Sequence, residues 1–232
     1  MKQISLLFAL CCYFISVLPA QNPPLKIEWG PPEEPAFSAA TRIGQSFSGY
    51  YDYVQRISPI YEIRRFDQNM KRISSGRISM LKDGQKRHLI GIVMMQGRMF
   101  VFTSFYELKS NEDLLLMEEL DPINLQLQGE PIAFDRIKAG RHTGFRIRVS
   151  TNENNLLVFT RTSLSGGDPE SYRLAVYSEN LVERWKSSMT LDHKSRQFKI
   201  EDVRLNNQGE VFVSGKRRVA AGQSPSNDGF FP

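Results

Sequence analysis

The sequence predicts an all-β protein, built as a β-propeller-like array of four-stranded antiparallel blades. Two strand-and-turn patterns that return about every 55 residues predict this fold class, and so does the abundance of aromatic residues. The 232-residue chain contains 15 Phe and 8 Tyr, residue types that are enriched in sheets. Hydrophobic residues make up 41% and charged residues 24%, which is typical of a folded globular protein and not of a disordered chain.

The first recurring pattern is a Val-Phe pair that follows a tight turn. It occurs at Val101–Phe102, Val158–Phe159 and Val211–Phe212, with spacings of 57 and 53 residues. Each turn is rich in Asn, Gln or Gly, and each follows a run of apolar or alternating residues. These runs are 89–95, 145–150 and 198–205. The pattern predicts a unit of strand, tight turn and strand that occurs three times.

The second pattern is an aromatic or apolar strand that ends in an Asp/Ser-x-Asn turn. Residues 61–70 match residues 172–181 at a distance of 111 residues, and a copy with one extra residue lies between them at 114–125. Asp, Ser and Asn side chains close turns by bonding the backbone, and Asn tolerates unusual backbone angles. The two patterns interleave, so one unit contains four short antiparallel strands. Residues 107–120 are the best helical candidate, but the repeat register favours a strand there.

Four-stranded units at this period are typical of β-propeller blades. Over about residues 40–218, the chain resembles the propeller-like repeats of secreted bacterial proteins of unknown function. This resemblance implies a fold and a compartment, and no activity. The units centre on residues 42–78, 88–130, 143–190 and 198 onward, which makes about three and a half blades.

The incomplete fourth unit leaves two alternatives. Residues 25–29 alternate as a short strand does, and they could pair with the last blade and close a four-bladed ring. Otherwise the array is truncated or open, with unpaired strand edges through which oligomers could form. We expect truncation or an open array.

The first twenty residues have the pattern of a secretory signal peptide. Lys2 gives a positive start, residues 4–18 form an apolar run, and Ala20 provides a small residue at a cleavage point. The run is short for a membrane span, so we expect cleavage and not a retained anchor. The sequence therefore predicts an exported protein, periplasmic or extracellular, with no stable membrane span after cleavage.

Four segments are expected along the chain. Residues 1–20 are the signal peptide, residues 21–40 are a proline-rich segment with a short strand, residues 41–218 are the propeller-like repeats, and residues 219–232 are a C-terminal tail.

Both cysteines, Cys11 and Cys12, lie inside the predicted signal peptide. The mature chain therefore has no thiol for a disulfide, a thiolate metal site or a cysteine nucleophile. About 210 mature residues can bury a core without disulfides.

The basic excess of the chain is small. The net charge of +5 falls to +4 without residues 1–20, because that segment contains one Lys and no acid. A nucleic-acid partner would need a broader basic face. We interpret the densest basic cluster, Lys216–Arg218, as a solvated strand end, with contact to an acidic polysaccharide or lipid surface as the alternative.

No catalytic, cofactor-binding or metal-binding set emerges from the sequence. The histidines are too far apart to predict a zinc site; they are His88, His142 and His193. No glycine-rich phosphate loop or dinucleotide motif occurs. Glycoside hydrolysis needs two carboxyl groups that face each other, whereas neighbours along a strand point to opposite faces. We therefore expect the adjacent acids to be solvated; they are Glu33–Glu34, Glu118–Glu119 with Asp121, and Glu201–Asp202.

Loops on one face of a propeller often form its binding surface. We interpret the loop 163–170 as a flexible connection between the second and third strands of its unit. If a contact region is assigned, it is this loop and its counterpart 109–113. Trp29 and Trp185 could stack on sugars, but Trp185 falls in a predicted outer strand, where contact between blades is the expected role.

These observations predict a non-enzymatic, exported domain that binds a protein or a glycan. One alternative is a glycan hydrolase or lyase whose carboxylates meet only in three dimensions. Another is a truncated remnant of a longer propeller without independent function.

Overall fold

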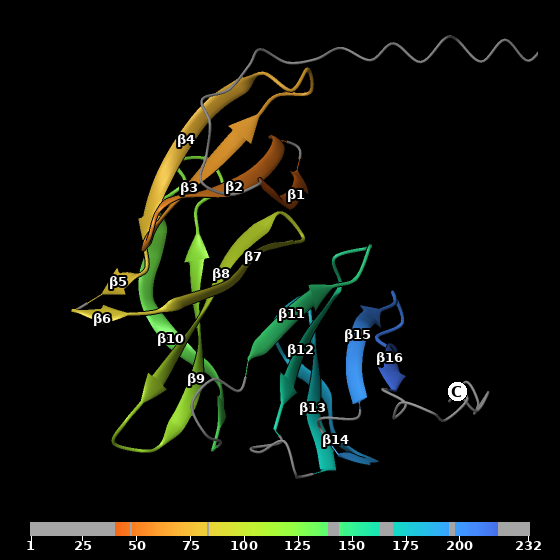
Figure 1. Ribbon diagram of the computed structural model, residues 1–232. Helices are drawn as coiled ribbons and strands as arrows, with labels where there is room; N and C mark the ends of the chain where they lie inside the picture. Colours follow the sequence, from red (N-terminus) through yellow and green to blue (C-terminus); the bar gives the residue numbers. More distant parts are fainter. Residues whose placement is uncertain are drawn as a thin grey trace, which may run out of the picture. The chain divides into compact units, whose positions relative to one another are not determined.

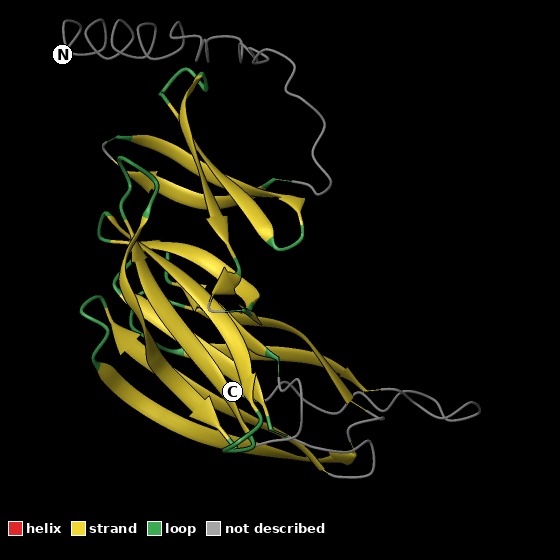
Figure 2. Cartoon of the chain, turned by 90° about the vertical axis from the view of Figure 1, so that its left-hand side faces the viewer, coloured by secondary structure: helices red, strands yellow, loops and turns green. Residues whose placement is uncertain are grey.

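The computed structural model describes residues 40–46, 48–82, 84–138, 144–162, 169–194 and 198–217. The predicted signal peptide, the proline-rich segment up to residue 39 and the tail 219–232 lie outside these ranges. All regular structure in the described ranges is β-sheet (Figure 2). None of the described residues forms a helix of the length and hydropathy that a membrane crossing requires.

Three four-stranded antiparallel sheets follow one another along the chain, each with its strands in sequence order (Figure 1). The first, blade 1, comprises β1 (Thr41–Ser46), β2 (Gly49–Ile57), β3 (Ile60–Phe66) and β4 (Arg72–Ser79). Blade 2 comprises β7 (His88–Met95), β8 (Arg98–Glu107), β9 (Glu112–Leu120) and β10 (Leu127–Ile137). Blade 3 comprises β11 (Phe145–Val149), β12 (Asn155–Arg161), β13 (Pro169–Ser178) and β14 (Glu183–Lys194).

A fourth, two-stranded sheet, blade 4, follows with β15 (Phe198–Leu205) and β16 (Val211–Arg217). The small hairpin of β5 (Leu81–Lys82) and β6 (Gln85–Lys86) connects blades 1 and 2 in the sequence. This is the predicted propeller-like array of about three and a half blades. The first strands of successive blades contact one another, β1 with β7, β7 with β11 and β11 with β15. The helical candidate at 107–120 is instead the last residue of β8, a turn and the strand β9, so a strand lies there as the repeat register predicted.

The three Val-Phe pairs occupy the same place in their sheets, because they lie in β8, β12 and β16, the second strands of blades 2, 3 and 4. Phe102 is 0% exposed and Phe159 is 3% exposed, whereas Phe212 is 59% exposed. The first two are flanked by a third strand and covered by a following blade. Among the described residues, β16 pairs only with β15, so Phe212 has neither neighbour.

The turns between third and fourth strands differ from the prediction in one respect. We expected Asn to adopt the unusual backbone angles, but the positive φ falls on the apolar residue that follows it, at Met70 (60°), Leu125 (58°) and Leu181 (62°). The acidic side chain holds the turn, since Asp67 Oδ1 accepts the backbone N–H groups of Asn69 and Lys71, both at 2.9 Å.

The residue with positive φ contacts the preceding blade. Leu125 is buried in the core between blades 1 and 2, and Leu181 lies against the core between blades 2 and 3. Met70 has no described blade before it and is 53% exposed. Gly76 of β4 makes room for this contact, because a Cβ at Gly76 would lie 2.5 Å from the Leu125 carbonyl oxygen.

Among the described residues, the core consists of three apolar clusters, one at each junction between blades. Because both faces of blades 2 and 3 are covered, their inner strands carry apolar residues on both faces. Strands of parallel sheets show the same pattern when both of their faces are covered. The burial explains why β8 and β12 read as nearly continuous apolar runs in the sequence.

Candidate functional site

The residues singled out in the sequence do not gather at one place. His88 lies exposed at the start of β7, whereas His142 and the side chain of His193 lie outside the described part. No group of three or more His, Cys, Asp or Glu residues that could hold a metal occurs among the described residues. Trp185 lies in the outer strand β14 as predicted and against the core between blades 3 and 4, where its indole N–H donates to the Gly209 carbonyl at 3.1 Å.

The predicted contact loops are described only in part. The loop 109–113 forms the turn between β8 and β9 and the start of β9, and there the Tyr106 hydroxyl donates a hydrogen bond to the Asn111 side-chain oxygen. In the other predicted contact loop, 163–170, residues 163–168 lie outside the described ranges.

A cavity of about 160 Å³ lies between blades 1 and 2. Its wall combines the end of β4, the segment before β7, and the faces of β8, β9 and β10 that point to blade 1. The polar lining residues are Ser79, Arg87, Thr103 and Glu118, and Met80 and Leu127 supply apolar surface. The backbone fixes one side, because the Arg87 N–H donates to the Met80 carbonyl at 2.8 Å.

Arg87 and Glu118 form an ion pair at this cavity, with Nη1 3.2 Å from Oε2 and with 10% and 6% of their side chains exposed. This burial corrects the prediction that the acids at 118–119 are solvated. Glu118 points toward blade 1, whereas the next residue, Glu119, points away and meets Arg98 at 2.9 Å with 38% of its side chain exposed. Adjacent acids on opposite strand faces are what the alternation of a strand requires.

The buried ion pair has a specific electrostatic consequence. Two charges removed from water lose hydration that their mutual attraction only partly restores, so such a pair adds little stability compared with apolar residues of the same size. The site nevertheless keeps a carboxylate acceptor and a guanidinium donor beside a cavity. Since their charges offset each other, the site presents hydrogen-bonding groups without a net charge.

Thr103 is the third polar group of the wall. It is the third residue of the first Val-Phe-Thr segment, lies on the same face of β8 as Val101, and is 1% exposed. Its Oγ1 has no hydrogen-bond partner among the described residues. A hydroxyl can donate one hydrogen bond and accept two, and a buried polar group without any partner costs about 1–3 kcal/mol of stability. Thr103 was not among the site residues predicted from the sequence.

The next junction of the array provides an internal comparison. Thr160 of β12 corresponds to Thr103, is fully buried, and also has an Oγ1 without a described partner. The register pairs Val101 with Glu118 in blade 2 and Val158 with Ala175 in blade 3. Ala175 therefore stands where Glu118 would be, and the buried carboxylate of the second junction is instead Asp135 of β10, which forms an ion pair with Arg173 of β13. The second junction therefore also combines a buried hydroxyl, a carboxylate and a guanidinium, and the first junction differs in that its carboxylate lies on β9, opposite Val101.

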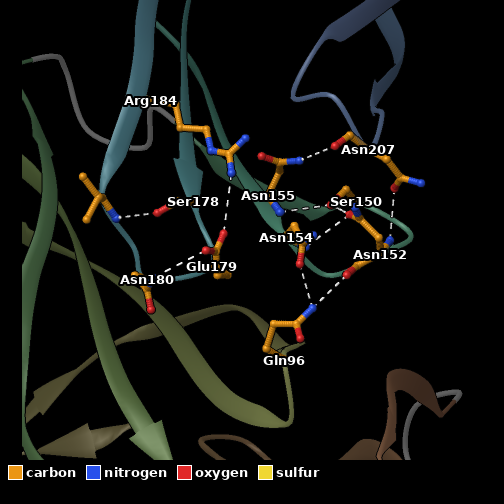
Figure 3. Close-up of polar contacts among 11 residues, drawn as sticks. Gln96, Ser150, Asn152, Asn154, Asn155, Ser178, Glu179, Asn180, Arg184 and Asn207 are labelled. Carbon is orange, nitrogen blue, oxygen red and sulfur yellow. Dashed lines mark hydrogen bonds and ion pairs between the residues drawn. The ribbon is translucent and has the colours of Figure 1, made fainter.

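A second polar feature joins the tight turns of blades 2, 3 and 4 (Figure 3). The Gln96 amide donates to the Asn152 carbonyl at 3.0 Å and to the Asn154 Oδ1 at 2.7 Å. Asn207 then accepts from the Asn152 backbone N–H at 3.0 Å and, through its carbonyl, from the Asn155 side chain at 2.9 Å. These amides bond one another from turn to turn, so we interpret them as ties between successive blades and not as a ligand site.

Comparisons with known proteins give a likeness among solved structures. No family model matches the sequence, and no curated protein matches it either. Among solved structures, the chain is similar to an endo-arabinase from Bacteroides thetaiotaomicron VPI-5482, with 12% sequence identity and a TM-score of 0.47, over 78% of this chain and 70% of that chain. A likeness at this level supports no inference about activity.

Proposed function

We propose that the protein is an exported binding module without catalytic activity, and that it holds part of a glycan in the cavity between blades 1 and 2. The observation that carries the proposal is the convergence of Thr103, Glu118 and Arg87 on one small cavity. Binding sites are concave, mostly apolar and equipped with a few placed polar groups. This wall combines four polar side chains with apolar surface from Met80, Leu81 and Leu127.

The residues of the cavity favour binding over hydrolysis. Glycoside cleavage uses two carboxyl groups, roughly 5–9.5 Å apart across the scissile bond. Glu118 is the only carboxylate among the described residues of the wall, and the Arg87 guanidinium holds it. A carboxylate that is paired with a guanidinium can still accept hydrogen bonds from a ligand. Without a second carboxyl group, however, it cannot divide the acid and base roles that glycoside cleavage needs.

The test uses the mature chain, residues 21–232, in affinity electrophoresis through gels that contain one neutral polysaccharide each. We expect retardation in at least one gel, and no release of reducing ends when the same polysaccharide is incubated with the protein. Release of reducing ends that a single carboxylate-to-amide change abolishes would show a hydrolase instead. The absence of retardation in a broad panel would contradict glycan binding. Sequencing of the N-terminus from exported protein tests cleavage after residue 20.

A further inference from the structure

We propose that the cavity between blades 1 and 2 binds one neutral sugar ring through adjacent hydroxyl groups, with Thr103 as the residue that selects for one of them. This inference rests on the proposed function and adds the class of ligand. It combines the size of the cavity, its charge and the unused hydrogen-bonding capacity of its wall.

The size of the cavity limits the ligand. A water molecule takes about 30 Å³ of liquid volume, so a cavity of about 160 Å³ is comparable to a cluster of roughly five waters. Pockets for drug-sized ligands span about 300–1,000 Å³. The space therefore suits a single sugar ring better than a drug-sized ligand.

The charge of the wall favours a neutral ligand. Arg87 would attract an anion if it stood alone, but Glu118 pairs with it at 3.2 Å. A ligand carboxylate or phosphate would approach the Glu118 carboxylate as closely as the Arg87 guanidinium, and a buried like-charge contact is costly. Neutral hydroxyl groups meet no such penalty.

The polar groups of the wall match a pair of neighbouring hydroxyls. Glu118 is an acceptor, Arg87 is a donor, and the Thr103 hydroxyl is both. Adjacent hydroxyls on a sugar ring each donate and accept, so the pair can donate to the carboxylate and accept from the guanidinium while one of them bonds Thr103. Met80 and Leu127 can contact the C–H surfaces of the ring. Thr103 Oγ1 lacks a partner before binding and is itself buried, so a ring hydroxyl gains this bond without the loss of another once the side chains of the wall shift to expose it.

The experiment measures binding of four neutral monosaccharides, D-glucose, D-galactose, D-xylose and L-arabinose, to the mature protein by saturation-transfer NMR and calorimetry. D-Glucuronate and D-galacturonate serve as the charged counterparts. We expect at least one neutral sugar to bind with a Kd of about 10 mM or tighter and its charged counterpart to bind at least about tenfold more weakly. Thr103→Val keeps the shape of the side chain and removes the hydroxyl, so it should raise the Kd for the neutral sugar at least about tenfold.

Two matched variants separate this effect from a change in folding. Thr160→Val removes the corresponding hydroxyl at the next junction, and Glu119→Gln changes the neighbouring carboxylate that points away from the cavity. Both should bind the sugar as the unchanged protein does. Circular dichroism must show that all three variants are folded; should Thr103→Val not be folded, Glu118→Gln takes its place with the same expected loss.

The outcomes distinguish this inference from the proposed function. If a polysaccharide gel retards the unchanged protein and Thr103→Val equally, glycan binding is supported and the assignment of the cavity is overturned. Binding of a free sugar that depends on Thr103, without retardation by any polysaccharide, would support the cavity and overturn the glycan function. Absence of binding by all four neutral sugars, or equal binding of the uronates, would overturn the inference.

Discussion

Replacement of Thr103 by Val should raise the stability of the ligand-free protein. Val has nearly the shape of Thr, so the substitution keeps the contacts of the side chain and removes the polar atom that has no described partner. A residue kept only for stability would show the opposite sign. The expected gain in stability, together with the expected loss of sugar binding, is the signature of a group retained for a ligand.

The magnitude follows from the burial of the hydroxyl. Thr103 is 1% exposed, and an unsatisfied polar group at such a site costs about 1–3 kcal/mol. Water that enters the cavity in part of the molecules reduces the cost, so we expect a gain of about 1 kcal/mol in the free energy of unfolding. For a domain of 150–250 residues this raises Tm by about 2–4 °C.

The assay is urea unfolding of the ligand-free mature protein, followed by tryptophan fluorescence and circular dichroism, with the midpoint and the slope compared between variants. Thr160→Val should show a gain of the same sign, because that hydroxyl is equally buried and unpaired. Thr103→Ala should lose stability, since it also removes a methyl group and leaves a void. A loss of more than about 1 kcal/mol in Thr103→Val would show that the hydroxyl is bonded in solution and would refute the reasoning.

Three further predictions concern the junctions between blades. Gly76→Ala should lower the free energy of unfolding by about 1–3 kcal/mol, because its Cβ would lie 2.5 Å from a backbone oxygen of blade 2. Gly91→Ala should cost less, since its Cβ would meet a side-chain methyl at 3.1 Å. Equal losses of stability in urea titrations would count against the contact at Gly76. Phe159→Ala should cost about 3–5 kcal/mol and Phe212→Ala less than about 1 kcal/mol, since only the first is buried, and a large loss for Phe212 would reveal that it is covered in solution. Burial, with Asp135 nearby, raises the pKa of Tyr177 to about 12. Because the unfolded chain releases this proton near pH 10, the free energy of unfolding should fall between about pH 10 and 12 by on the order of 2 kcal/mol. Thermal melts of Tyr177→Phe should lack this fall in stability.

The repeat pattern was enough to predict the blades. Each blade must bury side chains against the next blade, and it does so with similar residue types at a similar interval. The Val-Phe pairs predicted the second strands of blades 2, 3 and 4, and the Asp/Ser-x-Asn turns marked where the third strands end. The positive φ of the residue after each Asn was not predicted. Its backbone strain is offset by burial against the preceding blade, as for Leu125, and a turn pattern alone does not contain that contact.

The cavity could not be predicted in the same way, because it depends on residues from four separate strands and a connecting segment. Glu118 was grouped with its neighbour as a solvated acid, since a sequence does not show which face of β9 is covered. The partner of Glu118 lies 31 residues away. The inward polar position at Thr103, repeated at Thr160, was the one signal available in the sequence, and it became meaningful only once the inward face was known.

A crystal structure of the mature protein soaked with the best-binding neutral monosaccharide tests the central claim most directly. We predict density for one ring between blades 1 and 2, with a ring hydroxyl within hydrogen-bond distance of the Thr103 Oγ1 and others at Glu118 and Arg87. A closed junction, in which Thr103 bonds a protein atom and the sugar lies elsewhere or is absent, would contradict the account.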